Sequence, residues 1–493
     1  MTYTPEGSAA PSAPPVGPGP AVPPQTAHAP RPPLPPPAPD GGPPRRTAFA
    51  EGLDQVRAAA TTEPGRLRII GAVLALLVVA FGSVTAWQMN DRSAAADDVL
   101  HGSQPLSSAA AEIYSSLAAA NTAASSGFLA GGQETEQSRE DYEREMQEAA
   151  RQLAVAATAS ESGSDSEKRI ARLNTLLPEY KGLIERARAN NRLGYPLGGA
   201  YLRYANDKSQ KMLEEAQSIY DNENERLRDD YEDATSYPWA ALGLGVLAIG
   251  GLVWAQRRNY RRTNRVLNHG LVAATAASTV VLLWLAGGHT LARAGLNDSY
   301  EHGVRSLTVL NDARIASLTA RGNENLTLIS RGAQSIQIVV DGEKKSVDEF
   351  DHNFGIEMRN LERRLAAAER LADDDSGAKP VKAAGLGMEE WRERHGKARA
   401  ADDKGDYQCA LDQVIGGRPT ADCPDGGKST RECFDEVDKN LGIASRYEKH
   451  EFTTAAERGR GAMVGLPVGA AVLAVLGAAG AVLGIGRRLS EYR

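Results

Sequence analysis

The chain has 493 residues and carries 56 lysines and arginines against 63 aspartates and glutamates, a formal net charge of −7. This slightly acidic balance argues against a nucleic-acid-binding protein, because such proteins carry a clear excess of basic residues. Aromatic residues make up only 5% of the chain, which is few for one large folded core. The apolar residues are instead concentrated in four separate blocks.

The chain begins with a proline-rich segment. Residues 1–46 contain 17 of the 26 prolines. A segment of this composition cannot bury enough apolar surface to offset the entropy lost on ordering. We therefore predict that residues 1–66 form a disordered cytoplasmic tail of polyproline type. It would act as a tether or, alternatively, as a proline-rich ligand for a partner protein.

The four apolar blocks, 69–90, 234–256, 266–292 and 461–486, contain no Asp, Glu, Lys or Arg. Each is longer than the roughly 20 residues that a helix needs to cross a bilayer. Buried helices of a soluble domain would need equally apolar partners, and the rest of the chain is too polar to supply them. The sequence predicts membrane-spanning helices, with these bounds: 67–90, 234–256, 266–292 and 461–486.

The short loop 257–265 carries five arginines: Arg257, Arg258, Arg261, Arg262 and Arg265. By the positive-inside rule this loop lies in the cytoplasm. Arginines before the first span and after the last one place both termini on the same side, so that 487–493 is a cytoplasmic C-terminus of a cell-membrane protein. The two long segments 91–233 and 293–460 are then expected outside the cytoplasm.

All three cysteines, Cys409, Cys423 and Cys433, fall in the second outer segment. An oxidising compartment allows a disulfide there, and an odd number leaves one thiol over. Zinc is the alternative, but no C-x-x-C spacing is present and no histidine lies within ten residues. We predict one disulfide among the three, without assigning the pair.

Both outer segments have the apolar spacing of helices in a bundle. In the first, apolar residues recur every three or four positions, at Ile170, Leu173, Leu177, Tyr180, Ile184 and Ala187. A further helix is expected from 199 to 237, and Pro238 directly after it marks the entry to the second span. The predicted fold is an all-α membrane protein with four transmembrane helices and two extracytoplasmic helical bundles.

The two outer segments resemble each other. Tyr142 and Met146 align with Phe354 and Met358 at an offset of 212 residues, and Tyr180 aligns with Trp391 at an offset of 211. Each segment is also flanked by one span on either side. We interpret the pattern as an internal duplication.

No catalytic motif is present. The sequence contains no phosphate loop, H-E-x-x-H, G-x-S-x-G, kinase signature or dinucleotide fingerprint. Its histidines are scattered, and its acidic clusters lack the calcium-loop spacing. We expect a protein that is not an enzyme and that uses no cofactor or metal.

One stretch in the first segment combines turn residues with aromatic and basic side chains. Gly194, Pro196 and Asn190 favour a turn between two helices. Tyrosine and arginine are frequent anchors of protein interfaces. The predicted partner-docking residues are Asn190, Arg192, Tyr195, Tyr201, Arg203 and Tyr204. The alternative is an ordinary turn between two helices with no binding role.

The stretch ARANNRLGYPLG at 187–198, the following AYLR at 200–203, the arginine-rich loop and the ending GRRLSEYR at 486–493 carry a resemblance. Over about 67–493 the chain resembles the actinobacterial family of four-span membrane proteins called GlnX. Members are encoded beside an amino-acid-binding lipoprotein and the soluble serine/threonine protein kinase G. The tail and the three cysteines have no counterpart in that pattern.

The resemblance implies a signal transducer. A solute-binding lipoprotein outside would sense glutamate, aspartate or glutamine, and the membrane protein would pass its state to the kinase inside. The five arginines of loop 257–265 would form the cytoplasmic contact, although they also suit a role as anchors facing anionic membrane lipids. The alternative function is a membrane scaffold for envelope assembly. A transporter is disfavoured by the absence of charges within the spans. Whether the chain assembles as a homo-oligomer stays open.

Overall fold

The structure is a computed structural model, and it describes residues 61–131, 134, 136–263, 268–340, 342–417, 423 and 428–490. The chain divides into Met1–Ala58 and Ala59–Arg493, and every element below belongs to the second unit. Most of the predicted tail 1–66, Arg265, the side chain of Arg262 and the end of the C-terminal segment 487–493 lie outside the described residues.

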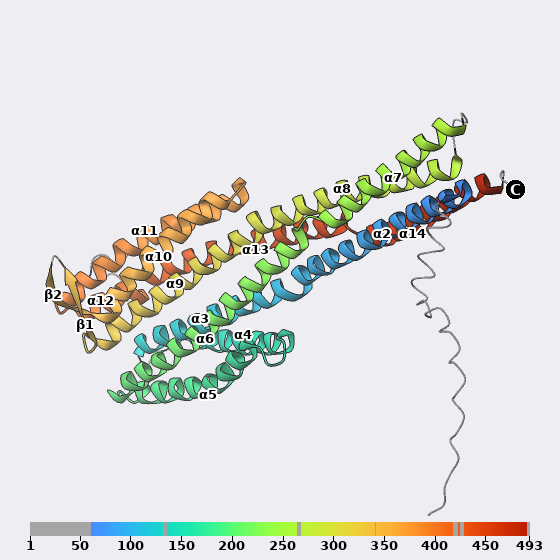
Figure 1. The fold of residues 1–493 in the computed structure, drawn as a ribbon. Helices are drawn as coiled ribbons and strands as arrows, with labels where there is room; N and C mark the ends of the chain where they lie inside the picture. The colour runs from blue at the N-terminus through green and yellow to red at the C-terminus, as the bar shows by residue number, and fades with distance from the viewer. Residues whose placement is uncertain are drawn as a thin grey trace, which may run out of the picture. The chain divides into compact units, whose positions relative to one another are not determined.

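The regular elements in the described part of the first half are all helices, joined by short turns (Figure 1). Its elements are α2 (Glu63–Asp98), the π-helix η1 (Val99–Ser103), α3 (Gln104–Leu129), α4 (Glu136–Ala159), α5 (Asp165–Arg192), α6 (Leu197–Thr235) and α7 (Trp239–Thr263). Side chains satisfy the free backbone N–H groups at helix starts, as when Ser164 accepts from the N–H of Glu167 at 3.1 Å.

The second half repeats this order with additions. Its elements are α8 (His269–Asp298), the π-helix η3 (Ser299–Val304), α9 (Arg305–Ser330), β1 (Ser335–Val340), β2 (Glu343–Asp348), α10 (Glu349–Leu371), α11 (Asp375–Asp403), α12 (Tyr407–Ile415), α13 (Thr430–Gly461) and α14 (Leu466–Ser490). At the start of α13, Ser429 and Glu432 form a reciprocal capping box.

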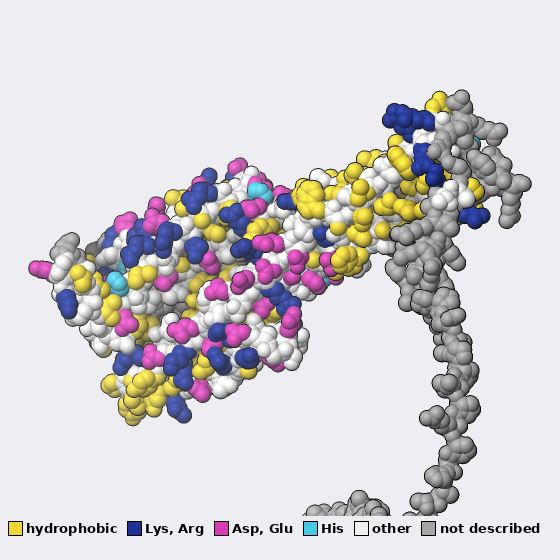
Figure 2. All heavy atoms as spheres, in the orientation of Figure 1, with side chains coloured by type: hydrophobic (Ala, Val, Ile, Leu, Met, Phe, Trp, Pro, Cys, Tyr) yellow, Lys and Arg dark blue, Asp and Glu magenta, His cyan; other side chains and the backbone are white. Residues whose placement is uncertain are grey.

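Four helical segments are long and apolar enough to cross a membrane, and they contain α2, α7, α8 and α14. Large apolar side chains on these helices point outwards, including Leu76, Leu247, Leu283 and Leu483. Figure 2 shows the resulting hydrophobic surface over this end of the unit. An apolar surface of this extent is unfavourable in water and suits lipid. The predicted all-α, four-span membrane fold is confirmed.

The spans pack closely through small residues. In Figure 1, α14 runs alongside α2, and it also packs against α8. A Cβ added at Gly270 of α8 would collide with the backbone of Gly480 and Gly484 in α14. Two small residues spaced four apart let helix backbones approach each other where no hydrophobic effect drives them together.

Beyond the spans, each half forms its own bundle. The first core is formed mainly by α3, α4, α5 and α6, and the second by α9, α10, α11 and α13. The bundles meet where α3 packs against α9. Side-chain hydrogen bonds cross this contact, from Thr122 to the carbonyl of Leu318 at 3.0 Å and from Asn325 to Ser125 at 3.0 Å.

The correspondence between the halves supports an internal duplication. The aligned pairs are buried in both bundles: Tyr142 and Phe354, Met146 and Met358, Leu153 and Leu365, Tyr180 and Trp391. A π-helix follows the first span of each half. The two helices after these π-helices are followed by glycines with positive φ, Gly131 at 68° and Gly332 at 73°.

The helix bounds differ from the predicted ones around the second span. The expected helix 199–237 ends at Thr235, and α7 begins at Trp239 instead of 234. Pro238 accounts for the break because it lacks a backbone N–H and disfavours helical geometry in the residue before it. At the other end, α7 continues to Thr263, so the described part of the predicted loop 257–265 is helical.

The sequence analysis also missed a β-hairpin. Strands β1 and β2 pair antiparallel, with Val340 opposite Glu343 and Ser335 opposite Asp348. An Asp-Gly pair between two runs rich in alternating apolar and polar residues is the usual signature of such a hairpin. That signal was available at 341–342, and the strong helical spacing on either side of it dominated the prediction.

Candidate functional site

The turn between α5 and α6 is the first candidate site, and the local sequence determines its shape. Gly194 takes a positive φ of 71° after the last turn of α5. Its N–H donates to the carbonyl of Asn191 at 3.0 Å, and the N–H of Tyr195 donates to the carbonyl of Asn190 at 2.9 Å. These two bonds form a Schellman motif. Asn191 also donates to the carbonyl of Phe128 at 3.0 Å, which ties the turn to the end of α3.

This turn presents apolar side chains to the outside. Tyr195 is 58% exposed and Tyr204 is 59% exposed. Leu193 and Leu197, which the sequence analysis did not single out, are exposed beside them. Figure 2 shows hydrophobic side chains gathered at this end of the α5–α6 hairpin. We call Leu193, Tyr195, Leu197 and Tyr204 the exposed tip.

The other predicted docking residues have mixed environments. Arg192 is exposed next to the exposed tip, and Arg203 is half-buried. Tyr201 packs against the first core. The side chain of Asn190 donates to the carbonyl of Arg186 at 2.8 Å within its own helix. Of the six residues, Arg192, Tyr195 and Tyr204 are therefore the most available to a partner.

The equivalent turn of the second bundle has a similar backbone conformation, but another helix covers the surface beside it. Gly405 has a φ of 83°, and Asp406 donates its N–H to the carbonyl of Ala401 at 3.0 Å. The chain then forms α12 before it returns through α13. Ala410 and Val414 of α12 are buried in a small cluster with Leu129 and Leu328. The additional helix thus hides apolar surface at this position.

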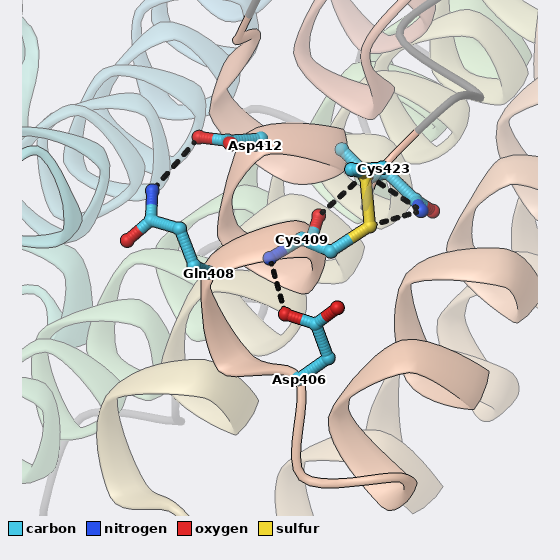
Figure 3. The surroundings of a disulfide bond; sticks show 6 residues. Asp406, Gln408, Cys409, Asp412 and Cys423 are labelled. Carbon is cyan, nitrogen blue, oxygen red and sulfur yellow. Dashed lines mark hydrogen bonds between the residues drawn. A yellow bond between two sulfur atoms is a disulfide. The ribbon is translucent and has the colours of Figure 1, made fainter. Parts of the chain in front are cut away.

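A disulfide between Cys409 and Cys423 holds α12 (Figure 3). Asp406 starts this helix by accepting the N–H of Cys409 at 3.1 Å. Cys433, the remaining thiol, is buried in the second core. Burial raises the pKa of its thiol to about 11, which makes the reactive thiolate scarce at neutral pH.

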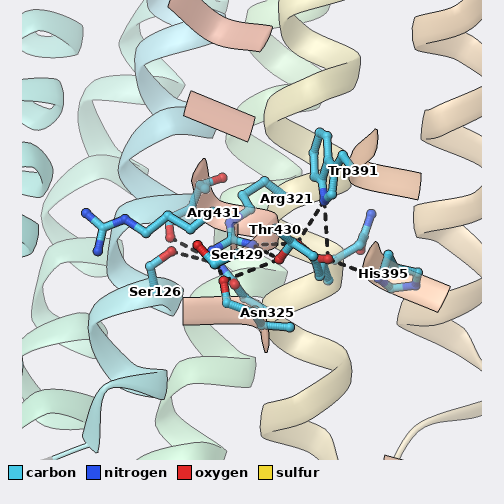
Figure 4. Close-up of polar contacts among 12 residues, drawn as sticks. Ser126, Arg321, Asn325, Trp391, His395, Ser429, Thr430 and Arg431 are labelled. Atoms are coloured by element: carbon cyan, nitrogen blue, oxygen red, sulfur yellow. Dashed lines mark hydrogen bonds and ion pairs between the residues drawn. The ribbon is translucent and has the colours of Figure 1, made fainter. Parts of the chain in front are cut away.

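A buried ionic network occupies the second bundle (Figure 4). Glu324 of α9 is fully enclosed and pairs with Arg321. Trp391 and His395 converge on the same carboxylate from α11, with the indole N–H at 3.1 Å and the imidazole Nδ1 at 3.0 Å. Arg321 also donates to Thr430 of α13 at 2.9 Å, so the network links three helices.

The network changes the protonation of its members. Burial alone would lower the pKa of His395, but hydrogen bonds and charges from Asp351 and Glu324 outweigh it and raise that pKa. Burial would likewise raise the pKa of Glu324, yet Arg321 and His395 hold it below its usual value. The ionised forms are therefore favoured, as a paired buried charge requires.

The first bundle places its buried charge differently. Arg188 is buried, pairs with Glu134 at 3.1 Å and with Glu185 at 3.1 Å, and its guanidinium lies 4.3 Å from the ring centre of Tyr142. Neutral hydrogen bonds surround Tyr180, the residue that aligns with Trp391. Tyr180 donates to Asn121 at 3.3 Å, and Asn121 donates to Asn206 at 3.1 Å. The two halves therefore stabilise equivalent positions by different chemistry.

A joint lies where the first bundle meets the spans. Ser236–Pro238 separates α6 from α7, and Arg92 of α2 holds this break by donating to the carbonyls of Ser236 at 2.7 Å and Tyr237 at 3.3 Å. Arg293 of α8 lies over the ring of Tyr237 at 4.4 Å. We call Arg92, Arg293 and 236–238 the arginine joint. Through Arg92 and Arg293 it links the end of α6 to α2 and α8.

The two π-helices directly follow α2 and α8, at matching positions of the two halves and a few residues beyond Arg92 and Arg293 along the chain. Ser299 of η3 shares a 2.8 Å hydrogen bond with Tyr231 of α6 and donates to the carbonyl of Phe452 at 3.3 Å. Extra backbone residues in a helix often mark places where it bends or changes register. Together with the arginine joint, η1 and η3 interrupt the regular α-helical geometry between the bundles and the spans.

The arginine group expected at the cytoplasmic side lies at the end of α7. Arg257 and Arg261 are exposed, and Arg258 lies over the ring of Trp254 at 5.4 Å. Figure 2 shows basic side chains next to the hydrophobic surface there. The group suits contact with a protein or with anionic lipid headgroups.

One group of carboxylates among the described residues could hold a cation. Oxygen atoms of Asp373, Asp374 and Glu451 lie within 4.8 Å of one another. Asp374 already accepts the N–H groups of Ser376 and Gly377 at the start of α11 and the hydroxyl of Tyr447 at 2.6 Å. Helix capping accounts for its position without a metal.

Comparison with known families adds one finding. Residues 95–232 match the family described as the actinobacterial sensor domain. The match runs from the end of α2 through η1 and α3–α6, so it contains the whole first bundle and the exposed tip. No curated protein and no solved structure matches the chain. The fold and this match indicate a multi-pass, sensor-type actinobacterial membrane protein with a sensing or signalling role.

Proposed function

We propose that the protein is a non-enzymatic transmembrane signal transducer. Its exposed tip would bind a solute-binding lipoprotein outside the cell, and its spans would pass the state of that complex to a soluble serine/threonine kinase inside. The observation that carries the proposal is the uncovered apolar tip within the segment that matches the sensor family. Exposed aromatic side chains of this kind are typical of protein-binding surfaces.

Two features support an outward orientation of the bundles. The disulfide between Cys409 and Cys423 lies in the second bundle, and such bonds persist in oxidising compartments. The arginines at the end of α7 lie across the spans from the bundles, where the positive-inside rule places the cytoplasm. Reporter fusions after Arg493 and within the turn at Gly163 would test this orientation; an extracytoplasmic C-terminus would contradict it.

The route of the signal follows from the helices. A partner at the exposed tip contacts the start of α6, which runs about 58 Å at about 1.5 Å per residue to the arginine joint. The joint and the π-helices allow two packings of the bundle on the spans, and a partner that prefers one packing shifts the population towards it. The change then reaches Arg257 and Arg261 at the far end of α7.

The docking step is tested by photo-crosslinking in cells. A crosslinking amino acid at Tyr195 or Tyr204 is expected to capture the lipoprotein. The matched control is Lys211, which is exposed on the same helix outside the tip. Capture that is equal at the control, or absent at both tip positions, would contradict docking at this surface.

The relay step is tested separately. Replacing Arg257, Arg258 and Arg261 with glutamine is expected to abolish the response of the kinase while docking outside continues. Membrane insertion of the variant must be verified, because the same arginines also set topology. A normal kinase response from a correctly inserted variant would remove these residues from the route. A scaffold without a sensing role predicts no kinase response in the wild-type protein either.

A further inference from the structure

A cavity of about 380 Å³ lies between the two bundles. Its walls come from α3 and α6 of the first half and from α9 and α13 of the second. Gln104, directly after η1, and Val304, the last residue of η3, both line it. The volume suits a small organic molecule. The cavity is distant along the chain from the exposed tip and plays no part in the proposed docking.

The charged groups of the cavity are unbalanced. Arg314 is neutralised by Asp438 at 3.0 Å and lies 3.9 Å from Glu112. Lys439, Arg446 and Lys449 line the exposed rim of the cavity, and none of them has an ion pair among the described residues. Their spacing along α13 places them on neighbouring parts of one helix face. The cavity therefore carries an excess of positive charge with no internal partner.

The inner wall contains a buried hydroxyl group whose polar neighbours also line the cavity. Tyr220 is only 3% exposed, and its hydroxyl has no hydrogen-bond partner of standard geometry. It lies beside the side chains of Asn224, Thr308 and Asn311, which also line the cavity. Buried hydroxyl groups are nearly always satisfied by protein, water or ligand.

We propose that this cavity binds a small organic di- or tricarboxylate. The excess of cations favours a ligand with more than one negative charge. Arg446 and Lys449 lie about 4.5 Å apart along the helix axis, at about 1.5 Å per residue. Two carboxylates on a short carbon chain can meet both cations at once, whereas a compact ion such as phosphate carries its charge at a single centre. Asn224, Asn311 and Thr308 offer hydrogen bonds to the remaining polar atoms of the ligand.

Binding would also connect the bundles. The walls come from both halves, so a ligand here holds α6 and α3 against α9 and α13. Because η1 and η3 border the cavity, an occupied and an empty cavity favour different packings of the bundles at those π-helices. The protein would then respond to a small anion directly, in addition to any partner at the exposed tip.

The test uses the full-length protein in nanodiscs at fixed pH and ionic strength. Citrate and succinate are titrated by calorimetry and by the midpoint temperature of unfolding, with inorganic phosphate and glycerol as reference solutes. We expect at least one of the two carboxylates to bind and to raise the midpoint, and phosphate and glycerol to have no effect. No binding of citrate or succinate would overturn the proposal, as would an equal response to phosphate.

Variants locate the site. The pair R446Q and K449Q is expected to weaken carboxylate binding by at least about tenfold, the loss typical of a removed charge-assisted contact. The matched control combines R359Q and K404Q, an arginine and a lysine that are exposed and lie outside the cavity. Both variants should unfold at the wild-type midpoint without ligand. Unchanged binding in the first pair, or equal weakening in the control, would exclude the cavity.

Discussion

The two bundles share one plan but differ at their tips and in their centres. In the first, the turn after α5 leads directly into α6 and leaves Tyr195 and Tyr204 exposed. In the second, the same turn is followed by α12 and a disulfide that cover the surface. In the second, Trp391 donates to the ionised network around Glu324, whereas the equivalent Tyr180 of the first makes a neutral hydrogen bond to Asn121.

This difference suggests a division of roles within a duplicated fold. Covered, cross-linked and ionically joined, the second bundle is suited to a fixed support. The first bundle keeps an apolar tip that a protein selected for stability alone would cover. The added helix α12 thus covers in one bundle the kind of apolar surface that stays exposed in the other.

The largest effect on stability is expected from Glu324. Replacing it with alanine leaves Arg321 buried without its counter-ion, which should cost about 3–5 kcal/mol in the free energy of unfolding. Replacing Asn121 of the first bundle with alanine breaks only neutral hydrogen bonds and should cost about 1–3 kcal/mol. Chemical unfolding of both variants gives the comparison. Equal losses would show that the ionic network does not distinguish the bundles.

Removing the disulfide should have the next largest effect. Its cysteines are 14 residues apart, and a loop of this size contributes about 3 kcal/mol in the chain-entropy description. We expect the variant with C409S and C423S to show faster hydrogen exchange in α12 and unchanged exchange in α5. Reductant should reproduce the effect in the wild type and add nothing in the variant. Exchange that rises equally in both bundles would contradict a local role.

The bundles should also differ in their response to pH. The pKa of His395 is raised, so its contribution is complete below its usual value of 6.5 and is lost as the pH rises through the raised value. Glu448 of α13 changes the stability of the fold in the same direction. Burial raises its pKa to about 7, so stability is again lost as the pH rises. The lowered pKa of Glu324 gives a contribution present above 4.5 and lost on acidification below it.

Hydrogen exchange at several pH values, corrected for the intrinsic rate, measures this response. We expect protection in α11 to fall more than protection in α5 as the pH rises above 6.5, since each pKa unit of difference is worth about 1.4 kcal/mol. The first core contains no histidine among its described residues. H395Q should flatten the dependence of α11, and an unchanged slope would exclude His395 as its source.

The smallest effect on stability is expected at the exposed tip. Replacing Tyr195 and Tyr204 with serine should change the free energy of unfolding by no more than about 0.5 kcal/mol, because both rings are largely in solvent. Capture of the proposed lipoprotein partner should nevertheless be lost. A large loss of stability would mean that the rings are structural, and intact capture would move the docking surface elsewhere.

The resemblance between the two sequence halves anticipated much of the architecture. Apolar spacing located the bundle helices, and residues such as Tyr180 and Trp391 are buried as that spacing requires. It could not anticipate α12, because a nine-residue helix gives too short a pattern. The turn between α5 and α6 was predicted from Gly194 and its neighbours, and its docking role stays a prediction. The exposure of Leu193 and Leu197 was missed, since leucines in a helical sequence normally indicate core.

Other features were invisible in the sequence because their parts are far apart along the chain. Arg92 is separated from Ser236 by 144 positions and Glu324 from His395 by 71, so neither contact follows a local rule. Lys439, Arg446 and Lys449 look like any solvated helix face in the sequence, and only the packing of the two bundles places them at the rim of a cavity. The pairing of Cys409 with Cys423 likewise required the position of α12.

Composition and spacing by themselves determined that this chain has four apolar helices, two polar helical bundles and a turn rich in tyrosine, because local periodicity records which face of a helix avoids water. Only the tertiary structure decided which tip stays open, where the buried charges find partners and which helices enclose a cavity. Those outcomes depend on distances between segments remote in sequence, and the packing of whole helices sets such distances.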